Sequence, residues 1–182
     1  SLKITGNKHP IKELICTYAN EVASKGINCA SGGDLGYIPG GGIFTSSVAD
    51  YLASATNIYA GLHYASPGAV VMENETLNWM KSIFGFPKDA TGSLTSGGSI
   101  ANLIALTAAR DNHKIKGSRI DKSVVYLSYH AHHCIVKALR IIGLEDIIIR
   151  FADLDNSHKI DARKLKNQID RDKAEALNPF LV

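Results

Sequence analysis

The sequence predicts an α/β domain with a parallel sheet, preceded by a mostly helical N-terminal arm. Two patterns support this fold class. From residue 91 onward, short apolar segments typical of buried strands alternate with segments of helical periodicity, as in consecutive βαβ units. Before residue 91, helical patterns are separated by stretches rich in glycine and proline. We therefore expect residues 1–90 to form the arm and residues 91–182 to form the start of an incomplete α/β domain.

The first helix of the arm is expected to begin after His9-Pro10, because proline suits the first turn of a helix. Its apolar face has the spacing i, i+3, i+4, i+7 and consists of Ile11, Leu14, Ile15 and Tyr18.

A second and a third helix complete the arm. Hydroxyl residues at 45–47 can each cap the second helix, whose inward stripe would include Val48 and Leu52. The third carries Leu77 and Phe84 on one face and should stop at the following Gly-Phe-Pro.

The α/β part is expected to contain several short strands with helices between them. A nearly all-apolar helix over 100–109 should be buried on most of its sides, and another helix should begin at Asp161. The expected strands are 92–95, 124–128, 147–152 and the start of one at 180–182. A chain that stops as a strand begins is expected to have lost its continuation.

Composition and charge indicate a globular protein and argue against nucleic-acid-binding and membrane proteins. Hydrophobic residues make up 45% of the chain and charged residues 20%, which is typical of a globular protein. The net charge is only +3, and the basic cluster around Arg163 and Lys166 alternates with apolar Leu165 and Ile169, as on the solvated face of a helix. We therefore expect no nucleic-acid partner. No apolar run is long enough to cross a bilayer, so no membrane association is expected either.

The cysteines indicate a reducing compartment. Cys16, Cys29 and Cys134 lie far apart, and no pair has metal-ligand or redox spacing. An odd number of scattered cysteines is typical of a cytoplasmic protein and not of a disulfide framework. The N-terminus also lacks the apolar core of a signal peptide.

The turn Ser96-Gly97-Gly98-Ser99, placed before an apolar helix, is a candidate anion site. The first turn of a helix has unpaired backbone N–H groups and a partial positive charge. The glycines allow an anion close to the backbone and Ser99 adds a hydroxyl, so a phosphate would suit the position. An ordinary tight turn with a serine cap explains the same residues, and both readings stay open. The phosphate motifs of nucleotide triphosphatases and dinucleotide folds are absent.

His130-Ala131-His132-His133 follows an expected strand, and ligands of open α/β sheets collect at the carboxyl ends of strands. The histidines could bind a metal, although no nearby carboxylate or cysteine completes a ligand set and we expect none. They could lie flat against a planar cofactor, or they could simply be a polar loop, the reading that the residues alone favour. The glycine-rich stretch 37–42 is likewise either a connector or a loop at the mouth of a ligand site.

These segments, taken together and in order, resemble the group II pyridoxal-phosphate-dependent amino-acid decarboxylases. That family includes the aromatic-amino-acid, tyrosine, histidine and glutamate decarboxylases. The matching segments are His9-Pro10, residues 37–42, Ser66-Pro67 with Glu73 to Trp79, Gly85-Phe86-Pro87, Thr95 to Leu103 with Arg110, and residues 125–128 with Ala131-His132. The resemblance implies a partial large domain of the aspartate-aminotransferase type (fold type I).

The resemblance also implies roles for single residues. Gly98 and Ser99 would contact the phosphate of pyridoxal 5'-phosphate, and His132 would stack on its ring and take part in catalysis. The residues near the amino-acid substrate would be Tyr37, Pro39 and Gly40. Family members are usually homodimers with sites at the interface, so residues 1–90 would be interface material.

The activity implied is decarboxylation of an L-amino acid to an amine by a carboxy-lyase. A family member also needs an aspartate at the pyridine nitrogen and a later lysine that holds the cofactor, and both lie beyond the position matching Val182. Lys159, in Asn156-Ser-His-Lys159, mimics the lysine motif at the wrong place and is expected to be a loop residue. The chain alone is therefore expected to be inactive.

The chain departs from the family pattern at two places, and two other functions are alternatives to decarboxylation. Ile100 stands where many members have an acidic residue, and Tyr129-His130 replaces the usual Asp-Gln. A carbon–carbon lyase of the sphingosine-phosphate-lyase type carries a similar turn. A truncated, non-catalytic dimerisation module is the second alternative.

Overall fold

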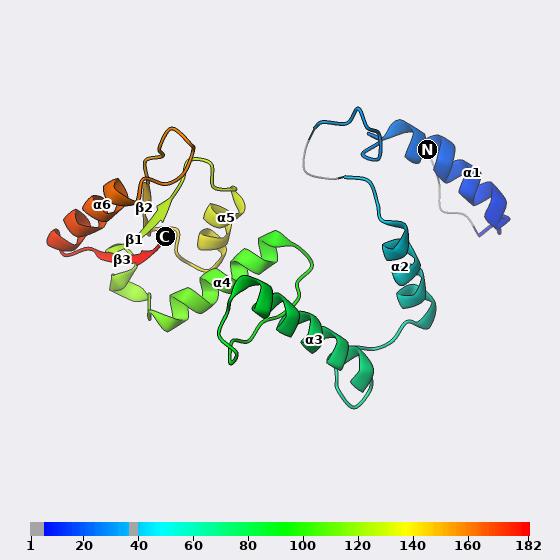
Figure 1. The fold of residues 1–182 in the computed structure, drawn as a ribbon, viewed down its shortest axis with the longest axis horizontal. Helices are drawn as coiled ribbons and strands as arrows, with labels where there is room; N and C mark the ends of the chain where they lie inside the picture. Colours follow the sequence, from blue (N-terminus) through cyan, green and yellow to red (C-terminus); the bar gives the residue numbers. More distant parts are fainter. Residues whose placement is uncertain (1–5, 37–39) are drawn as a thin grey trace. The chain divides into compact units, whose positions relative to one another are not determined.

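A computed structural model describes residues 6–36 and 40–182 (Figure 1). The chain divides into two compact units, Ser1–Val70 and Val71–Val182, and each is described by itself. Within its described residues the first unit contains helices and no strand, and the second contains a parallel sheet with helices. The predicted α/β fold class is therefore confirmed, while the functional boundary at residue 90 stays a prediction.

The first unit contains α1 (Ile11–Glu21), a short 3-10 turn (Ala23–Lys25) and α2 (Phe44–Thr56). Both predicted helices are present, but the predicted hydroxyl cap of α2 is wrong. The helix begins at Phe44, so the hydroxyl residues 45–47 lie inside its first turn, and the cap position is the apolar Ile43. The Ser47 hydroxyl donates back to the Phe44 carbonyl at 2.6 Å. The predicted burial of Val48 and Leu52 is also wrong, since no residue of α1 or α2 is buried.

The second unit is built around three parallel strands in the order β2-β1-β3. Its elements are α3 (Pro67–Phe84, starting just before the unit boundary), α4 (Gly98–Asn112), a 3-10 turn (Gly117–Arg119), β1 (Ser123–Leu127), α5 (Cys134–Ile141), β2 (Ile148–Phe151), α6 (Ala162–Ala174) and β3 (Asn178–Leu181). Both ladders are parallel: Val125 pairs with Ile149 of β2, and Ser123 pairs with Asn178 of β3.

Central strand β1 has the composition of a strand covered on both faces. Its first four residues, 123–126, are all buried, and a continuous apolar run is typical of a parallel strand between helices. Successive side chains of a strand point to opposite faces. Val125 joins the core cluster with α4 and α5, whereas Tyr126 bonds to Asp172 of α6.

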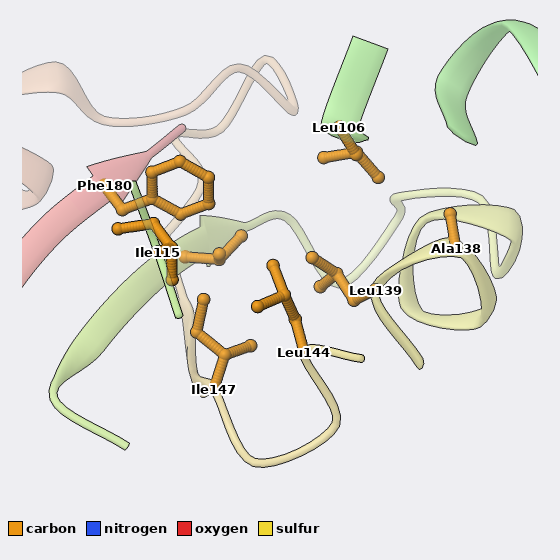
Figure 2. Close-up of a cluster of buried hydrophobic side chains, with 8 residues drawn as sticks. Leu106, Ile115, Ala138, Leu139, Leu144, Ile147 and Phe180 are labelled. Carbon is orange, nitrogen blue, oxygen red and sulfur yellow. The ribbon is translucent and has the colours of Figure 1, made fainter. Parts of the chain in front are cut away.

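The core cluster gathers apolar side chains from α4, α5, the sheet and the connections between them (Figure 2). Its buried members are Leu106, Ile115, Val125, Ala138, Leu139, Leu144, Ile147 and Phe180. Since these side chains are separated by up to 74 positions in the sequence, from Leu106 to Phe180, the core fixes α4 and α5 against one face of the sheet.

Two further predictions differ from the structure. Residues 92–95 form no strand, because a strand needs a partner and the described sheet contains only β1, β2 and β3. Helix α4 is not buried on most sides: Leu106 is its buried residue, while Ile104 is 50% exposed. Contacts with α5 and the core cover one side of the helix, and apolar content alone does not say how many sides are covered.

Among the described residues, no helix has the length and apolar content to cross a bilayer.

Candidate functional site

The turn before α4 leaves backbone donors free at the start of the helix. Gly97 is the cap residue, without a side-chain hydrogen bond, and its angles of φ 158° and ψ 169° are rare for residues with a side chain. The first helical hydrogen bond is from the Ala101 N–H to the Gly97 carbonyl, at 3.1 Å. The N–H groups of Gly98 and Ser99 therefore lie ahead of the hydrogen-bonded ladder, at the positive end of the helix.

This turn fits a phosphate group. A Cβ atom built on Gly97 or Gly98 would meet nothing within 4 Å, so the space beside the backbone is open. The Thr95 hydroxyl donates to the Gly97 carbonyl at 3.1 Å, which holds the turn in shape. Ser99 is exposed, and its hydroxyl makes no hydrogen bond within the described part of the chain. An anion could thus receive both backbone N–H groups and a hydroxyl.

The histidine loop begins where β1 ends. The Ser128 hydroxyl accepts a hydrogen bond from the His130 N–H at 3.0 Å, and the Ser128 carbonyl accepts one from Ala131 at 2.9 Å. His132 is exposed, and its ring lies 4.2 Å from the ring of His133 with a tilt of 35°. Its Nδ1 accepts a hydrogen bond from the Cys134 N–H at 3.2 Å. In the neutral ring the proton is therefore on Nε2.

A single side chain joins the turn to the histidine loop. Asn102 of α4 donates through Nδ2 to the Gly98 carbonyl at 2.8 Å and to the Cys134 Sγ at 3.6 Å. Cys134 is the first residue of α5 and the donor to His132. The structure thus brings Gly98, Ser99 and His132 to one edge of the second unit, the carboxyl edge of the sheet.

His130 has a different partner from His132. The His130 ring packs edge-on against His158 from the loop after β2, with 5.9 Å between ring centroids. No group of three or more histidine, cysteine, aspartate or glutamate side chains is placed to hold a metal ion in residues 6–36 and 40–182.

The expected substrate-side residues belong to the first unit of the chain. Tyr37 and Pro39 lie outside the described residues, and Gly40 is an exposed residue of the first unit. Their roles stay predictions. Lys159 is an exposed residue of a tight turn, in which its N–H donates to the Asp155 carboxylate at 3.0 Å.

Sequence reasoning missed the two residues that make the link, Asn102 and Cys134. The sequence did contain a signal for Asn102, because it is a polar side chain in the largely apolar stretch 100–109 and lies four residues after Gly98, on the same face of the helix. Cys134 had none, because only the packing of α5 beside α4 places its sulfur at the Asn102 amide.

Comparison with known proteins identifies the family. A sequence model of the pyridoxal-dependent decarboxylase conserved domain matches residues 14–182. The aromatic-L-amino-acid decarboxylase of Bacillus atrophaeus is 38% identical over 148 residues, which cover 81% of this chain and 30% of that protein. An acidic amino acid decarboxylase of Xenopus tropicalis is 30% identical over 142 residues, covering 75% of this chain and 28% of that protein.

Solved structures share the fold over the whole chain. The glutamate decarboxylase domain of a Vibrio parahaemolyticus diaminobutyrate-pyruvate transaminase and L-2,4-diaminobutyrate decarboxylase superposes with a TM-score of 0.88 at 23% identity, over 100% of this chain and 42% of that one. Oryza sativa TDC, solved with PLP and tryptamine, gives 0.84 at 21% identity, over 98% of this chain and 40% of that one.

The chain spans about a third of the length of its curated relatives. The family match nevertheless covers almost all of it, including the turn, the histidine loop and the sheet. This protein therefore belongs to the pyridoxal-dependent decarboxylase family, whose cofactor is pyridoxal phosphate.

Proposed function

We propose that this chain forms the phosphate-binding and ring-stacking part of the cofactor site in an enzyme that decarboxylates an L-amino acid to an amine. One observation carries the proposal: Asn102 ties the open turn at Gly98 to the loop of His132. An anion cradle and an exposed imidazole on the same edge suit a planar, phosphorylated cofactor.

In this proposal the backbone N–H groups of Gly98 and Ser99, with the Ser99 hydroxyl, bind the phosphate. The exposed imidazole of His132 lies against the ring and fixes its plane. The Nε2–H of His132 can donate to a ligand, because Nδ1 is already occupied by the Cys134 N–H. Pyridoxal phosphate, when bound, supplies the electron sink for cleavage at Cα.

The proposal names an L-amino acid as the substrate and does not choose between aromatic and acidic side chains. The Bacillus relative is named for aromatic and the Xenopus relative for acidic amino acids. Both are decarboxylases, which favours this reaction over the carbon–carbon lyase and the non-catalytic module. Substrate contacts from Tyr37, Pro39 and Gly40 are part of the proposal.

We further propose a cytoplasmic homodimer in which residues 1–90 form interface material. Support for the interface comes from α1, where Ile11, Ile15 and Tyr18 are between 60% and 71% exposed. Such a continuous apolar face is costly in water unless another surface covers it. Support for the location comes from the cysteines, since Cys16, Cys29 and Cys134 are all free.

Cofactor binding is tested by crowding the cradle. Gly98→Val places a branched side chain where the phosphate would lie, and we expect the Kd for pyridoxal 5'-phosphate to rise roughly tenfold or more, about 1.4 kcal/mol. Absorbance titration of the 182-residue chain measures this. Gly68→Val is the matched control, because Gly68 also lies in the first turn of a helix with open space around it. Equal affinities of the two variants, or no binding by the unmodified chain up to millimolar cofactor, would contradict the proposal.

Turnover is expected to need more than these residues. The family resemblance places the pyridine-nitrogen aspartate and the cofactor-binding lysine further along than the position matching Val182. We therefore expect the 182-residue chain, supplied with cofactor and a panel of L-amino acids, to release no amine. Amine detected by mass spectrometry above a cofactor-only control would refute this expectation.

A further inference from the structure

Helices α4 and α5 are joined by two side-chain hydrogen bonds with the same sequence offset. Asn102 donates to Cys134 near the start of both helices, and Arg110 donates through Nη1 to the Ile142 carbonyl, at 2.8 Å, near their ends. In each pair the partners are 32 residues apart. Because the two offsets are equal, the helices run parallel. Asn102 and Arg110 are eight residues apart, which places the two links about 12 Å apart along the axis at a rise of 1.5 Å per residue.

The link at the N-terminal ends is part of a continuous path. It runs from the Gly98 carbonyl to Asn102 Nδ2 at 2.8 Å, on to Cys134 Sγ at 3.6 Å, and through the Cys134 N–H to His132 Nδ1 at 3.2 Å. Cys134 is 6% exposed, so its sulfur is held inside the packing between the helices. The path connects the two expected ends of a ligand site through a half-buried amide and a buried thiol.

We propose that Asn102 and Cys134 are positioning residues that set the orientation of the His132 ring and its spacing from the phosphate turn. The inference rests on the proposed function for its consequence, because the phosphate and ring of the cofactor are covalently joined by a short linker that limits their separation. Two anchors that recognise both parts must therefore keep their own spacing within narrow limits, and a displacement of about 1 Å is enough to weaken a site severely.

The geometry also separates this role from simple stabilisation. Arg110 joins the same two helices but lies at their far ends, away from His132. Removing the Arg110 link should loosen the helix pair without changing the ring. Removing the Asn102 link should change the ring.

The first test reads the His132 ring in the chain without any ligand. ¹⁵N NMR of the imidazole should show one neutral form, protonated at Nε2, in the unmodified chain and in Cys134→Ser, which keeps a polar acceptor for Asn102. Asn102→Ala and Cys134→Ala should show averaged ring signals as the loop is released. Arg110→Ala should keep the unmodified ring signals while its thermal midpoint falls. Unchanged signals in both alanine variants, or an equal change in Arg110→Ala, would overturn the inference. If Asn102→Ala does not fold, the pair Cys134→Ala and Cys134→Ser gives the answer.

The second test is titration with pyridoxal 5'-phosphate. Asn102→Ala should weaken binding roughly five- to tenfold, the worth of about one hydrogen bond, and Cys134→Ser should stay within about twofold of the unmodified chain. Wild-type affinity in Asn102→Ala would count against positioning. Failure of the unmodified chain to bind cofactor would instead contradict the proposed function, and the ring signals would still test the inference on their own.

Discussion

At the scale of single residues, a buried polar cluster joins β1, β2 and α6 through Tyr126, Arg150 and Asp172. The Tyr126 hydroxyl donates to Asp172 Oδ2 at 2.6 Å, and Arg150 Nη2 donates to Asp172 Oδ1 at 3.2 Å. Burial of Tyr126, followed by the hydrogen bond and the negative charge of Asp172, raises the pKa of this phenol far above its ordinary value. The hydroxyl therefore stays protonated and remains a donor, which satisfies a carboxylate that is 3% exposed.

Removing this donor should destabilise the second unit. In Tyr126→Phe the Asp172 Oδ2 atom stays buried without its hydrogen bond, and such a loss costs about 1–3 kcal/mol. Urea denaturation followed by circular dichroism measures the change. Tyr129→Phe is the control, because Tyr129 is 74% exposed and its ring keeps its stacking contact with Phe151 without the hydroxyl. The effect of this variant should stay within about 0.5 kcal/mol. Similar losses in both variants would show that the buried hydrogen bond is not the cause.

At the scale of elements, the sequence predicted most helices and strands, because their periodicity and end signals are local. The strands β1 and β2, the helices that follow them and the start of α6 at Asp161 all lie where the patterns placed them. The failures concern properties that depend on distant partners. Residues 92–95 have strand-like composition but no ladder, and the apolar surface of α4 has a cover on one side only.

The same distinction applies to the candidate site. The glycine turn and the histidine loop are visible as short motifs, but the roles expected of Gly98, Ser99 and His132 come from the family resemblance and stay predictions. The link between them could not be predicted, because Asn102 and Cys134 are 32 residues apart and meet only after α4 and α5 pack. Motifs and resemblance indicate candidate ligand-binding groups, whereas packing reveals the groups that lie behind them.

The start of α6 gives a prediction for acid stability. Asp161 accepts hydrogen bonds from the Arg163 and Lys164 N–H groups, both at 3.0 Å, and chiefly the bond from Lys164 holds the pKa of this carboxyl below its ordinary value. A lowered pKa in the folded state means that the stabilisation is complete above the pKa of an unfolded aspartate, about 3.9, and is lost as the pH falls through the lower folded value.

Asp161→Asn keeps an accepting oxygen but cannot titrate. We therefore expect the unmodified chain to lose stability more steeply than Asp161→Asn below about pH 4, in urea denaturation at a series of pH values. Asp121→Asn serves as control, since the Asp121 carboxylate accepts no hydrogen bond within the described residues, and its pH profile should follow that of the unmodified chain. Parallel profiles for Asp161→Asn and the unmodified chain would rule out the cap as a source of acid sensitivity.

At the scale of the whole molecule, the two units differ in how much apolar surface they cover. The second unit has a core of eight buried side chains, whereas α1 and α2 contribute no buried residue. A helix with an uncovered apolar face gains stability when a second surface packs on it. This contrast supports the proposed dimer, in which the arm finds its cover on another copy of the chain.

A charge placed on that face should therefore break the dimer. Ile15→Asp puts a carboxylate in the middle of the apolar face of α1, and sedimentation velocity should show a shift from dimer to monomer. Asn20→Asp adds the same charge to the opposite side of α1 and should leave the mass unchanged. A monomer at all concentrations of the unmodified chain, or equal masses for both variants, would refute the dimer with this interface.

The strand order has a consequence for the motions of the site. The chain passes from β1 outward to β2 through α5, then returns past β1 to β3 through α6, and Val125 and Tyr126 face helices on opposite sides of the sheet. Exposing β1 to water thus requires breaking two ladders and removing a helix from each face. Such an opening approaches the cost of global unfolding, so amide hydrogens in this strand belong to the slowest-exchanging class. The loop that carries His132 is attached to the part of the unit that fluctuates least.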